Sequence, residues 1–256
     1  MFPLKDNIPT DRFPLVTVAL IVANTLMYFL FQKGGILHGP SNTNVIEYGA
    51  IPCELSHPGQ HVDAFRDAAG RVQFQCANGP GAIPGAPSSY LTVLTSMFMH
   101  GSILHLAGNM LFLWIFGNNV EDSMGRVKFI AFYLLGGIAA LALQTVVGPN
   151  ASVPTVGASG AIAAVLGGYI LLYPRARVVT VIFLVIFFTV LELPALLVLG
   201  LWFVQQAVFG ATNLTDPTGG GGGVAYFAHI GGFLFGLLVI RAIARAKPVP
   251  ARFPVY

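Results

Sequence analysis

Charged residues are scarce in this chain of 256 residues, at 9% of the total, against about 25% in an ordinary soluble domain. Hydrophobic residues make up 55% and the mean hydropathy is +0.74. This composition excludes a typical water-soluble domain and predicts a chain that lies in a lipid bilayer. The net charge of +3 is small and no basic tract is present, so a nucleic-acid partner is not expected.

Cysteine is also scarce, because the chain has only Cys53 and Cys76, both in the hydrophilic segment 33–96. Three interpretations remain open. A disulfide would close a loop of about two dozen residues and stabilise the chain by roughly 3 kcal/mol in an oxidising compartment. The two thiols could instead be free, or they could bind a metal together with His57 and His61. The disulfide is the favoured interpretation.

Long hydrophobic runs, by contrast, are abundant, and they predict six helical spans. The run 178–209 is too long for one span, at about 48 Å of helix against a hydrocarbon core of about 30 Å. Glu192 and Pro194 therefore divide it, with its first part along the membrane interface. The expected fold is all-α, a polytopic six-helix bundle in one domain, 1–256. The spans are expected at 15–31, 97–116, 127–147, 159–173, 194–209 and 224–240.

The distribution of lysine and arginine predicts the orientation of this bundle. Six spans place both termini on one side, and all Lys and Arg except Lys33, Arg66 and Arg71 fall on that side. Positive residues favour the cytoplasmic side, so both termini are predicted to be inside. Segment 33–96 then becomes a long outer loop between the first and second spans.

Strongly polar residues interrupt three of the runs: His105 and Asn109, Ser159, and His229. Such groups are costly inside a bilayer and by default mark a functional site. Counted back from the predicted inner ends of their spans, Ser159 lies about 21 Å up, and His105 and His229 each about 18 Å. Asn109 lies about one turn deeper. The four residues are therefore predicted to form one site.

The fourth span is too short to cross the bilayer, at about 22 Å from Ser159 to Tyr173. Residues 153–158 should then enter as non-helical backbone lining a water-filled cavity. Ser159 would begin the helix, where free N–H groups favour negative charge. Small residues recur every four positions on the fourth and sixth spans, a pattern that allows close helix contact. They are Gly160, Ala164 and Gly168 on one span, and Ala228, Gly232 and Gly236 on the other.

In this order, the residues resemble the rhomboid family of intramembrane serine proteases, over about residues 12–245. Glu121 and Gly125-Arg126 also match the family's pattern. The main matching elements are His100-x4-His105-x3-Asn109, Gly157-Ala158-Ser159-Gly160 and Ala228-His229-x2-Gly232-x3-Gly236.

The resemblance implies a role for each residue. Ser159 would be the nucleophile and His229 the general base, without a carboxylate. His105, Asn109 and the Ser159 backbone N–H would bind the oxyanion. Gly157 would keep the loop before Ser159 open. From spacing alone, His100 is five residues from His105 and points elsewhere, so it is expected to brace the outer loop, and Gly160, Gly232 and Gly236 are expected to support the helix contact.

Two positions depart from the family's pattern. Leu91-Thr92 stand where many members carry Trp-Arg, and Ala163 stands where many carry a Tyr or Phe that packs on the base. Another side chain is therefore expected to support the His229 ring.

The implied activity is cleavage of transmembrane segments in single-pass or polytopic membrane-protein substrates, through an acyl-enzyme and without a metal or cofactor. The expected location is a prokaryotic plasma membrane, with the site opening to the extracytoplasmic side. A catalytically silent, helix-binding relative is the first alternative. A transporter is the second, although no repeats support it. The run Gly219–Gly223 is interpreted as a mobile cap over the site rather than as a plain linker.

Overall fold

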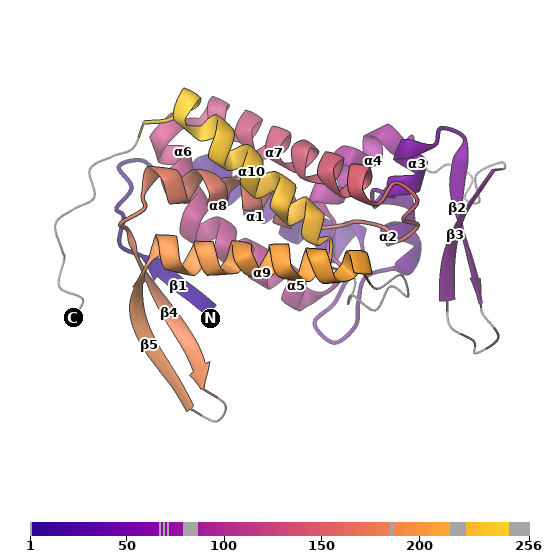
Figure 1. The fold of residues 1–256 in the computed structure, drawn as a ribbon, viewed down its shortest axis with the longest axis horizontal. Helices are drawn as coiled ribbons and strands as arrows, with labels where there is room; N and C mark the ends of the chain where they lie inside the picture. Colours follow the sequence, from indigo (N-terminus) through magenta and orange to yellow (C-terminus); the bar gives the residue numbers. More distant parts are fainter. Residues whose placement is uncertain are drawn as a thin grey trace.

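The long helices of the computed structural model run side by side along its longest axis (Figure 1). The structure describes residues 2–66, 68, 70, 72–78, 87–184, 187–215 and 224–245. Strand β1 and the end of α10 lie at one end of the bundle, and the hairpin β2–β3 lies at the other (Figure 1). The helices of the bundle are α1 (Leu15–Leu26, continued by a π-helical turn, Met27–Phe31), α5 (Ile103–Phe112), α6 (Asn118–Met124), α7 (Arg126–Val147), α8 (Ser159–Leu172), α9 (Ala195–Thr215) and α10 (Tyr226–Ile243).

Apolar helices occupy all six predicted spans, but only four of them are long enough to cross a membrane. Within the described residues these are Ile103–Met124, Arg126–Val147, Ala195–Thr212 and Tyr226–Ile243. The helices Leu15–Phe31 and Ser159–Leu172 are shorter. The chain is thus a mostly helical membrane protein, and the length criterion supports four of the six spans.

The second span begins later than predicted. Residues 97–116 were expected to be helical, but a short 3₁₀ turn, Ser96–Phe98, is followed by non-helical backbone, and α5 begins at Ile103. Ser102 caps α5, because its hydroxyl accepts a hydrogen bond from the backbone N–H of His105 at 3.1 Å. The helix then continues through a π-helical turn, Leu113–Gly117, into α6. His105 consequently lies in the first turn of α5.

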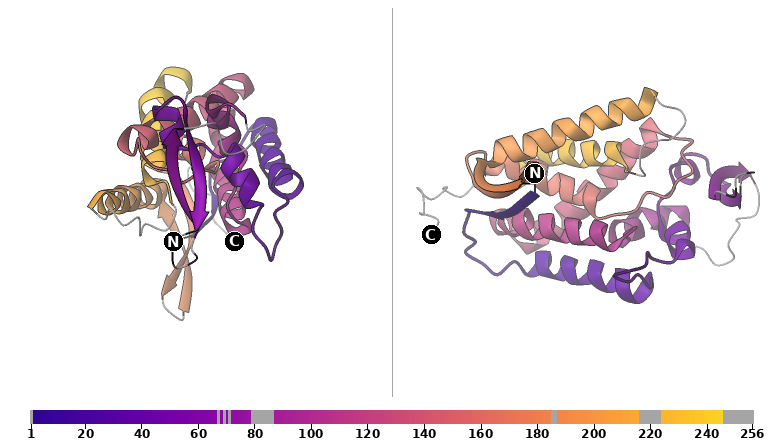
Figure 2. Two further views of the ribbon diagram at one scale, coloured as in Figure 1. Left: turned by 90° about the vertical axis from the view of Figure 1, so that its right-hand side faces the viewer. Right: turned by 90° about the horizontal axis from the view of Figure 1, so that it is seen from below.

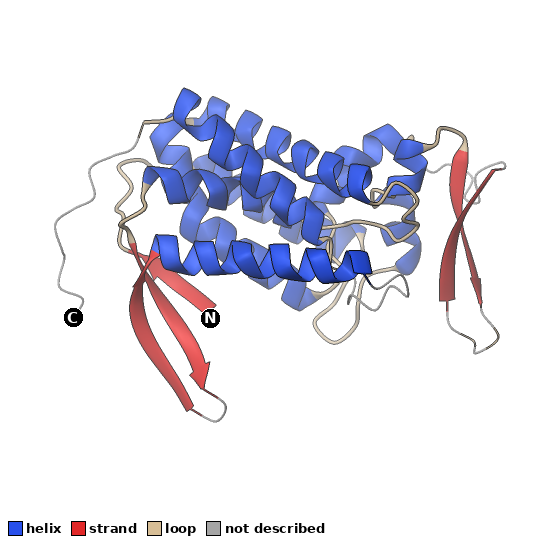
Figure 3. Ribbon diagram, in the orientation of Figure 1, coloured by secondary structure: helices blue, strands red, loops and turns tan. Residues whose placement is uncertain are grey.

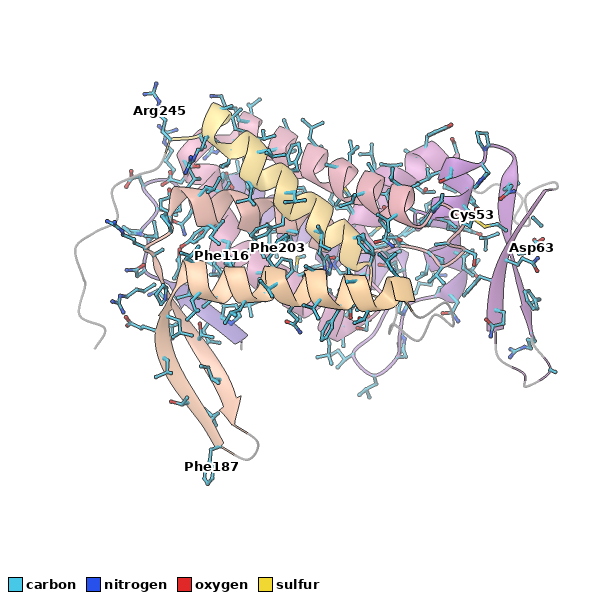
Figure 4. The ribbon with its side chains drawn as sticks, in the orientation of Figure 1. Cys53, Asp63, Phe116, Phe187, Phe203 and Arg245 are labelled. Atoms are coloured by element: carbon cyan, nitrogen blue, oxygen red, sulfur yellow. A yellow bond between two sulfur atoms is a disulfide. The ribbon has the colours of Figure 1, made fainter. Side chains whose placement is uncertain are left out.

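The prediction of an all-α fold was wrong, since five strands are present in the described residues (Figure 3). Strands β1 (Phe2–Asp6), β4 (Arg177–Leu184) and β5 (Phe187–Pro194) form an antiparallel sheet with β4 in the centre. Hairpin β4–β5 replaces the segment expected along the interface, and the labelled Phe187 lies at its tip, away from the helices (Figure 4). Its valine, threonine and phenylalanine residues favour strands, and hydropathy alone does not separate such a run from a helix.

The outer loop is not a plain hydrophilic linker, because it contains short helices and a β-hairpin. It contains α2 (Asn42–Tyr48), α3 (Pro52–Ser56), α4 (Ser89–Thr95) and the hairpin of β2 (Gln60–Arg66) with β3 (Val72–Asn78). Cys53 and Cys76 are joined by a disulfide (Cys53 is labelled in Figure 4). Within the described residues no cluster of His, Cys, Asp or Glu is arranged to hold a metal ion. Of the three interpretations of the cysteines, the structure therefore shows the disulfide.

Helix α8 lies in the middle of the bundle and packs closely on α7 and α10. The predicted contact between the two small-residue faces is present. A Cβ atom on Gly232 would collide with the carbonyl oxygen of Gly160, and one on Gly236 with that of Ala164. Glycine is therefore required for the two backbones to touch. This contact brings the N-terminal turns of α8 and α10 together.

The N-terminal strand is tied to α8 by a buried carboxylate. Asp6 Oδ2 accepts hydrogen bonds from Asn119 Nδ2 at 2.7 Å and from the Tyr169 hydroxyl at 2.5 Å. Burial raises the pKa of Asp6 from 3.8 to about 6, although the hydrogen bond from Tyr169 acts in the opposite direction. Ionisation of Asp6 in the folded protein is thus less favourable than in the unfolded chain.

This raised pKa predicts a pH dependence of stability. The folded state binds the Asp6 proton more tightly, so this proton stabilises the fold fully below pH 3.8, and the contribution is lost as the pH rises to about 6. The loss amounts to roughly 3 kcal/mol. Between pH 4 and pH 7, the unfolding free energy of the wild type should therefore fall relative to that of Asp6→Asn. Denaturant titration in detergent would measure the difference. Asp63→Asn, on the exposed outer hairpin, is the matched control, and a pH-independent difference for Asp6→Asn would contradict the expectation.

Candidate active site

Ser159 and His229 are in direct contact. Ser159 is the first residue of α8, His229 lies in the first turn of α10, and His229 Nε2 is 2.8 Å from Ser159 Oγ. The two residues are 70 positions apart in the chain. The backbone contact between Gly160 and Gly232 sets this short distance, because a Cβ atom on Gly232 would collide with the carbonyl oxygen of Gly160 and push the two helices apart.

The backbone before Ser159 is non-helical, as the short fourth span predicted. Gly157 has φ of +133°, a conformation that favours glycine. Its N–H donates to the carbonyl oxygen of Ser96 at 2.9 Å. A Cβ atom here would also lie 2.9 Å from the Cε1 and Nε2 atoms of His105. Gly157 therefore serves two purposes, since it allows the turn into α8 and leaves room for the His105 ring.

The hydrogen bonds of His105 indicate its tautomer. The N–H of Gly101 donates to Nδ1 of His105 at 3.4 Å, so Nδ1 is an acceptor and the ring proton belongs on Nε2. Nε2 is the nitrogen beside Gly157, close to Ser159. A neutral His105 thus presents an N–H donor toward the serine.

Two further donors lie at the same place. The backbone N–H of Ser159 belongs to the first turn of α8, where N–H groups have no partner within the helix. Asn109 lies one turn beyond His105 on α5, and its buried Nδ2 has no hydrogen-bond partner in the described protein. An unpaired buried amide is costly, so Asn109 is suited to bind an acceptor that arrives with a substrate.

Two cavities meet at the Ser159–His229 pair. The larger, of about 690 Å³, lies between residues 151–157, α7 and the start of α10. The smaller, of about 320 Å³, is bounded by α5, α8 and α9 and is lined mainly by apolar side chains, among them Leu104, Phe112, Ile162 and Leu166. His105, Ser159 and His229 line both cavities, and Asn109 lines the smaller one. The Ser159–His229 pair is thus accessible from two sides, through the larger cavity beside the loop 151–157 and through the smaller, apolar cavity.

Sequence reasoning missed two residues of α9 that contact His229. The ring of Trp202 packs on the imidazole, with centroids 5.7 Å apart and planes inclined by 36°. Gln206 Oε1 is 2.8 Å from His229 Nδ1, and Gln206 is 6% exposed. Trp202 supplies the ring support that Ala163 does not. The sequence signal that could have identified them is the polar Gln206, one helical turn after Trp202 in a mostly apolar span.

His100 lies apart from the pair. Its backbone N–H donates to Gln32 Oε1 at 2.9 Å, and its carbonyl accepts from Gln32 Nε2 at 3.0 Å. The ring packs edge-on against His105, with centroids 5.1 Å apart. His100 thus joins the end of the first helical segment, just before the outer loop, to the segment before α5. The glycine run 219–223, expected to form a cap, lies outside the described residues.

Comparisons with known proteins give a match to one family model and several similar relatives. The family model described as "Rhomboid domain" matches residues 87–246. Rhomboid protein 1, mitochondrial, of Saccharomyces cerevisiae is 31% identical over 170 residues, 62% of this chain and 43% of that protein. Presenilin-associated rhomboid-like protein, mitochondrial, of Mus musculus is 32% identical over 153 residues, 58% of this chain and 37% of that protein. RHOMBOID-like protein 12, mitochondrial, of Arabidopsis thaliana is 30% identical over 178 residues, 63% of this chain and 47% of that protein.

These relatives correct the expected location. The prediction of a prokaryotic plasma membrane was wrong, because the relatives named above are mitochondrial proteins of eukaryotes. The chain spans less than half the length of these relatives.

The family model covers well over half of the chain, including every residue of the Ser159–His229 site described above. The resemblance inferred from the three motifs is confirmed: the chain belongs to the rhomboid family.

Proposed function

We propose that this protein is an intramembrane serine endopeptidase that cleaves transmembrane segments of other membrane proteins. The single observation that carries the proposal is the 2.8 Å contact between Ser159 Oγ and His229 Nε2 at the N-terminal end of α8. A serine hydroxyl is a weak nucleophile until a neighbouring base accepts its proton. This pair supplies both groups beside three hydrogen-bond donors.

The geometry supports a two-step mechanism. Ser159 Oγ attacks the scissile carbonyl carbon while His229 Nε2 accepts the hydroxyl proton, and a tetrahedral intermediate forms. Its oxyanion accepts hydrogen bonds from His105 Nε2–H, Asn109 Nδ2–H and the Ser159 N–H. His229 then donates its proton to the leaving amine. Water, deprotonated by His229, hydrolyses the acyl-enzyme and restores Ser159.

The two cavities support a substrate that comes from the bilayer. The smaller cavity has apolar walls suited to the side chains of a transmembrane segment, and the larger is partly lined by polar residues such as Gln144 and Thr155. A helical substrate must unwind locally, because its carbonyls are otherwise hydrogen-bonded within the helix. By family analogy, a small residue such as alanine precedes the scissile bond.

The membrane arrangement is part of the proposal. Six spans with both termini on one side are supported by the position of β1 and the end of α10 at the same end of the bundle (Figure 1). The mitochondrial names of the relatives support a mitochondrial membrane as the location.

A fluorophosphonate probe tests the function directly, because it reacts with an activated serine. The full chain in proteoliposomes is expected to be labelled at Ser159 and to cleave a model transmembrane substrate, and Ser159→Ala should do neither. Labelling that persists in Ser159→Ala would contradict the assignment of the nucleophile. A folded wild type that neither reacts nor cleaves would instead be a catalytically silent, helix-binding protein.

A further inference from the structure

We infer that Gln206 is a positioning residue of this site, holding His229 in the tautomer and orientation that activate Ser159. The inference rests on the proposed function. It extends the Ser159–His229 pair to a hydrogen-bonded triad whose third member is a neutral amide from α9.

The hydrogen bonds of the His229 imidazole are the first support for this role of Gln206. A neutral imidazole has one donor nitrogen and one acceptor nitrogen. For His229 to act as the base, Nε2 must accept the Ser159 hydroxyl proton, so the ring proton must be on Nδ1. Gln206 Oε1 lies 2.8 Å from Nδ1 and is an acceptor. With the Gln206 amide oriented as it is, Oε1 toward the ring, the opposite tautomer would place two acceptors, Nδ1 and Oε1, against each other and leave Ser159 without a base.

The surroundings of Gln206 are the second support for this role. Gln206 is 6% exposed in a mostly apolar helix, whereas its neighbour Gln205 is exposed. Burial of an amide is costly unless it forms hydrogen bonds, and the bond to His229 is one that Gln206 forms. Trp202, one turn earlier on α9, packs on the face of the same ring. Helix α9 therefore holds the imidazole both by its face and by its edge. Figure 2 shows this helix (orange) along the side of the bundle beside α10.

The third support is that no buried carboxylate of the described chain takes the place of Gln206 beside His229. The buried carboxylates of the described chain, Asp6 and Glu121, are bonded elsewhere: Asp6 to Asn119 and Tyr169, Glu121 to the first turn of α1. A serine–histidine–aspartate site uses its carboxylate both to orient the histidine and to stabilise its protonated form. Gln206 orients without adding charge. Orientation and charge stabilisation are thus separable at this site by substitution.

Gln206→Leu removes the acceptor while keeping a similar volume. We expect kcat to fall about 100-fold with KM nearly unchanged, which is less than the ~10⁴-fold loss caused by the wrong tautomer in a serine–histidine–aspartate site. The rate of fluorophosphonate labelling should fall in parallel. Gln205→Leu, the same substitution one position away on the exposed side of α9, is the matched control and should leave both rates unchanged.

Gln206→Glu provides a readout that a purely structural role would not affect. A carboxylate accepts the same hydrogen bond, so activity is retained, but its charge stabilises the protonated imidazole. The acid limb of the pH profile of kcat/KM should then move to higher pH by about one unit or more. Gln205→Glu controls for the added charge and should leave the profile in place.

The outcomes separate this inference from the proposed function. If the wild type cleaves and labels, but Gln206→Leu keeps its rate or Gln206→Glu keeps the wild-type pH profile, the positioning role is overturned and the protease assignment stands. If the wild type itself neither labels nor cleaves, the proposed function fails. Thermal midpoints in detergent identify a variant that does not fold. Should Gln206→Leu be such a variant, the pH profile of Gln206→Glu decides the question.

Discussion

Alanine at Ser159, at His229 or at both is expected to reduce kcat to the same residual level, at least about 10⁴-fold below the wild type. The nucleophile and its base act as one unit, since Ser159 is activated only through the 2.8 Å contact with His229. Once either residue is lost, removal of the other changes little more. Initial rates on a fluorogenic transmembrane substrate in proteoliposomes, at saturating substrate, would measure the effect.

Two controls accompany this comparison. Ser123→Ala removes a hydroxyl in α6 that bonds a backbone carbonyl, and His38→Ala removes an exposed imidazole of the outer loop. Neither should change kcat. If the losses in Ser159→Ala and His229→Ala instead multiply in the double variant, the two residues act independently and the proposed mechanism is wrong.

Asn109→Leu is expected to lower kcat by about 10²- to 10³-fold with little change in KM, as removal of one oxyanion donor does in other acyl-transfer enzymes. The Nδ2 group of Asn109 is buried beside the Ser159–His229 pair without a hydrogen-bond partner in the described protein. It would gain one when the oxyanion forms, so its removal affects the transition state more than the bound substrate. Loss of His105 Nε2–H in His105→Ala should have a similar effect on kcat.

Asn24→Leu is the matched control, because Asn24 is a fully buried asparagine of α1 whose amide donates to the carbonyl of Leu20. It should alter thermal stability but not kcat per folded molecule. A rise in KM at constant kcat in Asn109→Leu would show that Asn109 binds the ground state, and the oxyanion role would be rejected.

Much of the candidate site was accessible from the sequence because its signals are local. Ser159, His229 and the small residues beside them lie within single apolar runs, and helix geometry converts their spacing into depth and face. The predicted contact of the two glycine faces is present in the structure, with Gly232 against Gly160 and Gly236 against Ala164. Their chemical roles stay predictions until activity is measured.

The errors lie where local signals are ambiguous. Hydropathy alone does not separate an interfacial helix from a hairpin, and the run 177–194 forms β4 and β5, which pair with each other while β4 also pairs with β1. The start of α5 depends on the Ser102 cap rather than on hydropathy. Composition indicates a bilayer but not which one, so the relatives, not the residues, corrected the location.

The sequence by itself determined that this protein lies in a membrane, that it belongs with the rhomboid proteins, and which serine and histidine to examine. These features depend on composition and on spacing within single helices. The tertiary structure decided which side chains surround the imidazole of His229. Trp202 and Gln206 reach it only because α9 is rotated and placed so that both face α10. That placement results from packing between helices that are distant in the chain. Hydropathy along one helix does not specify it closely enough to predict a hydrogen bond between two side chains.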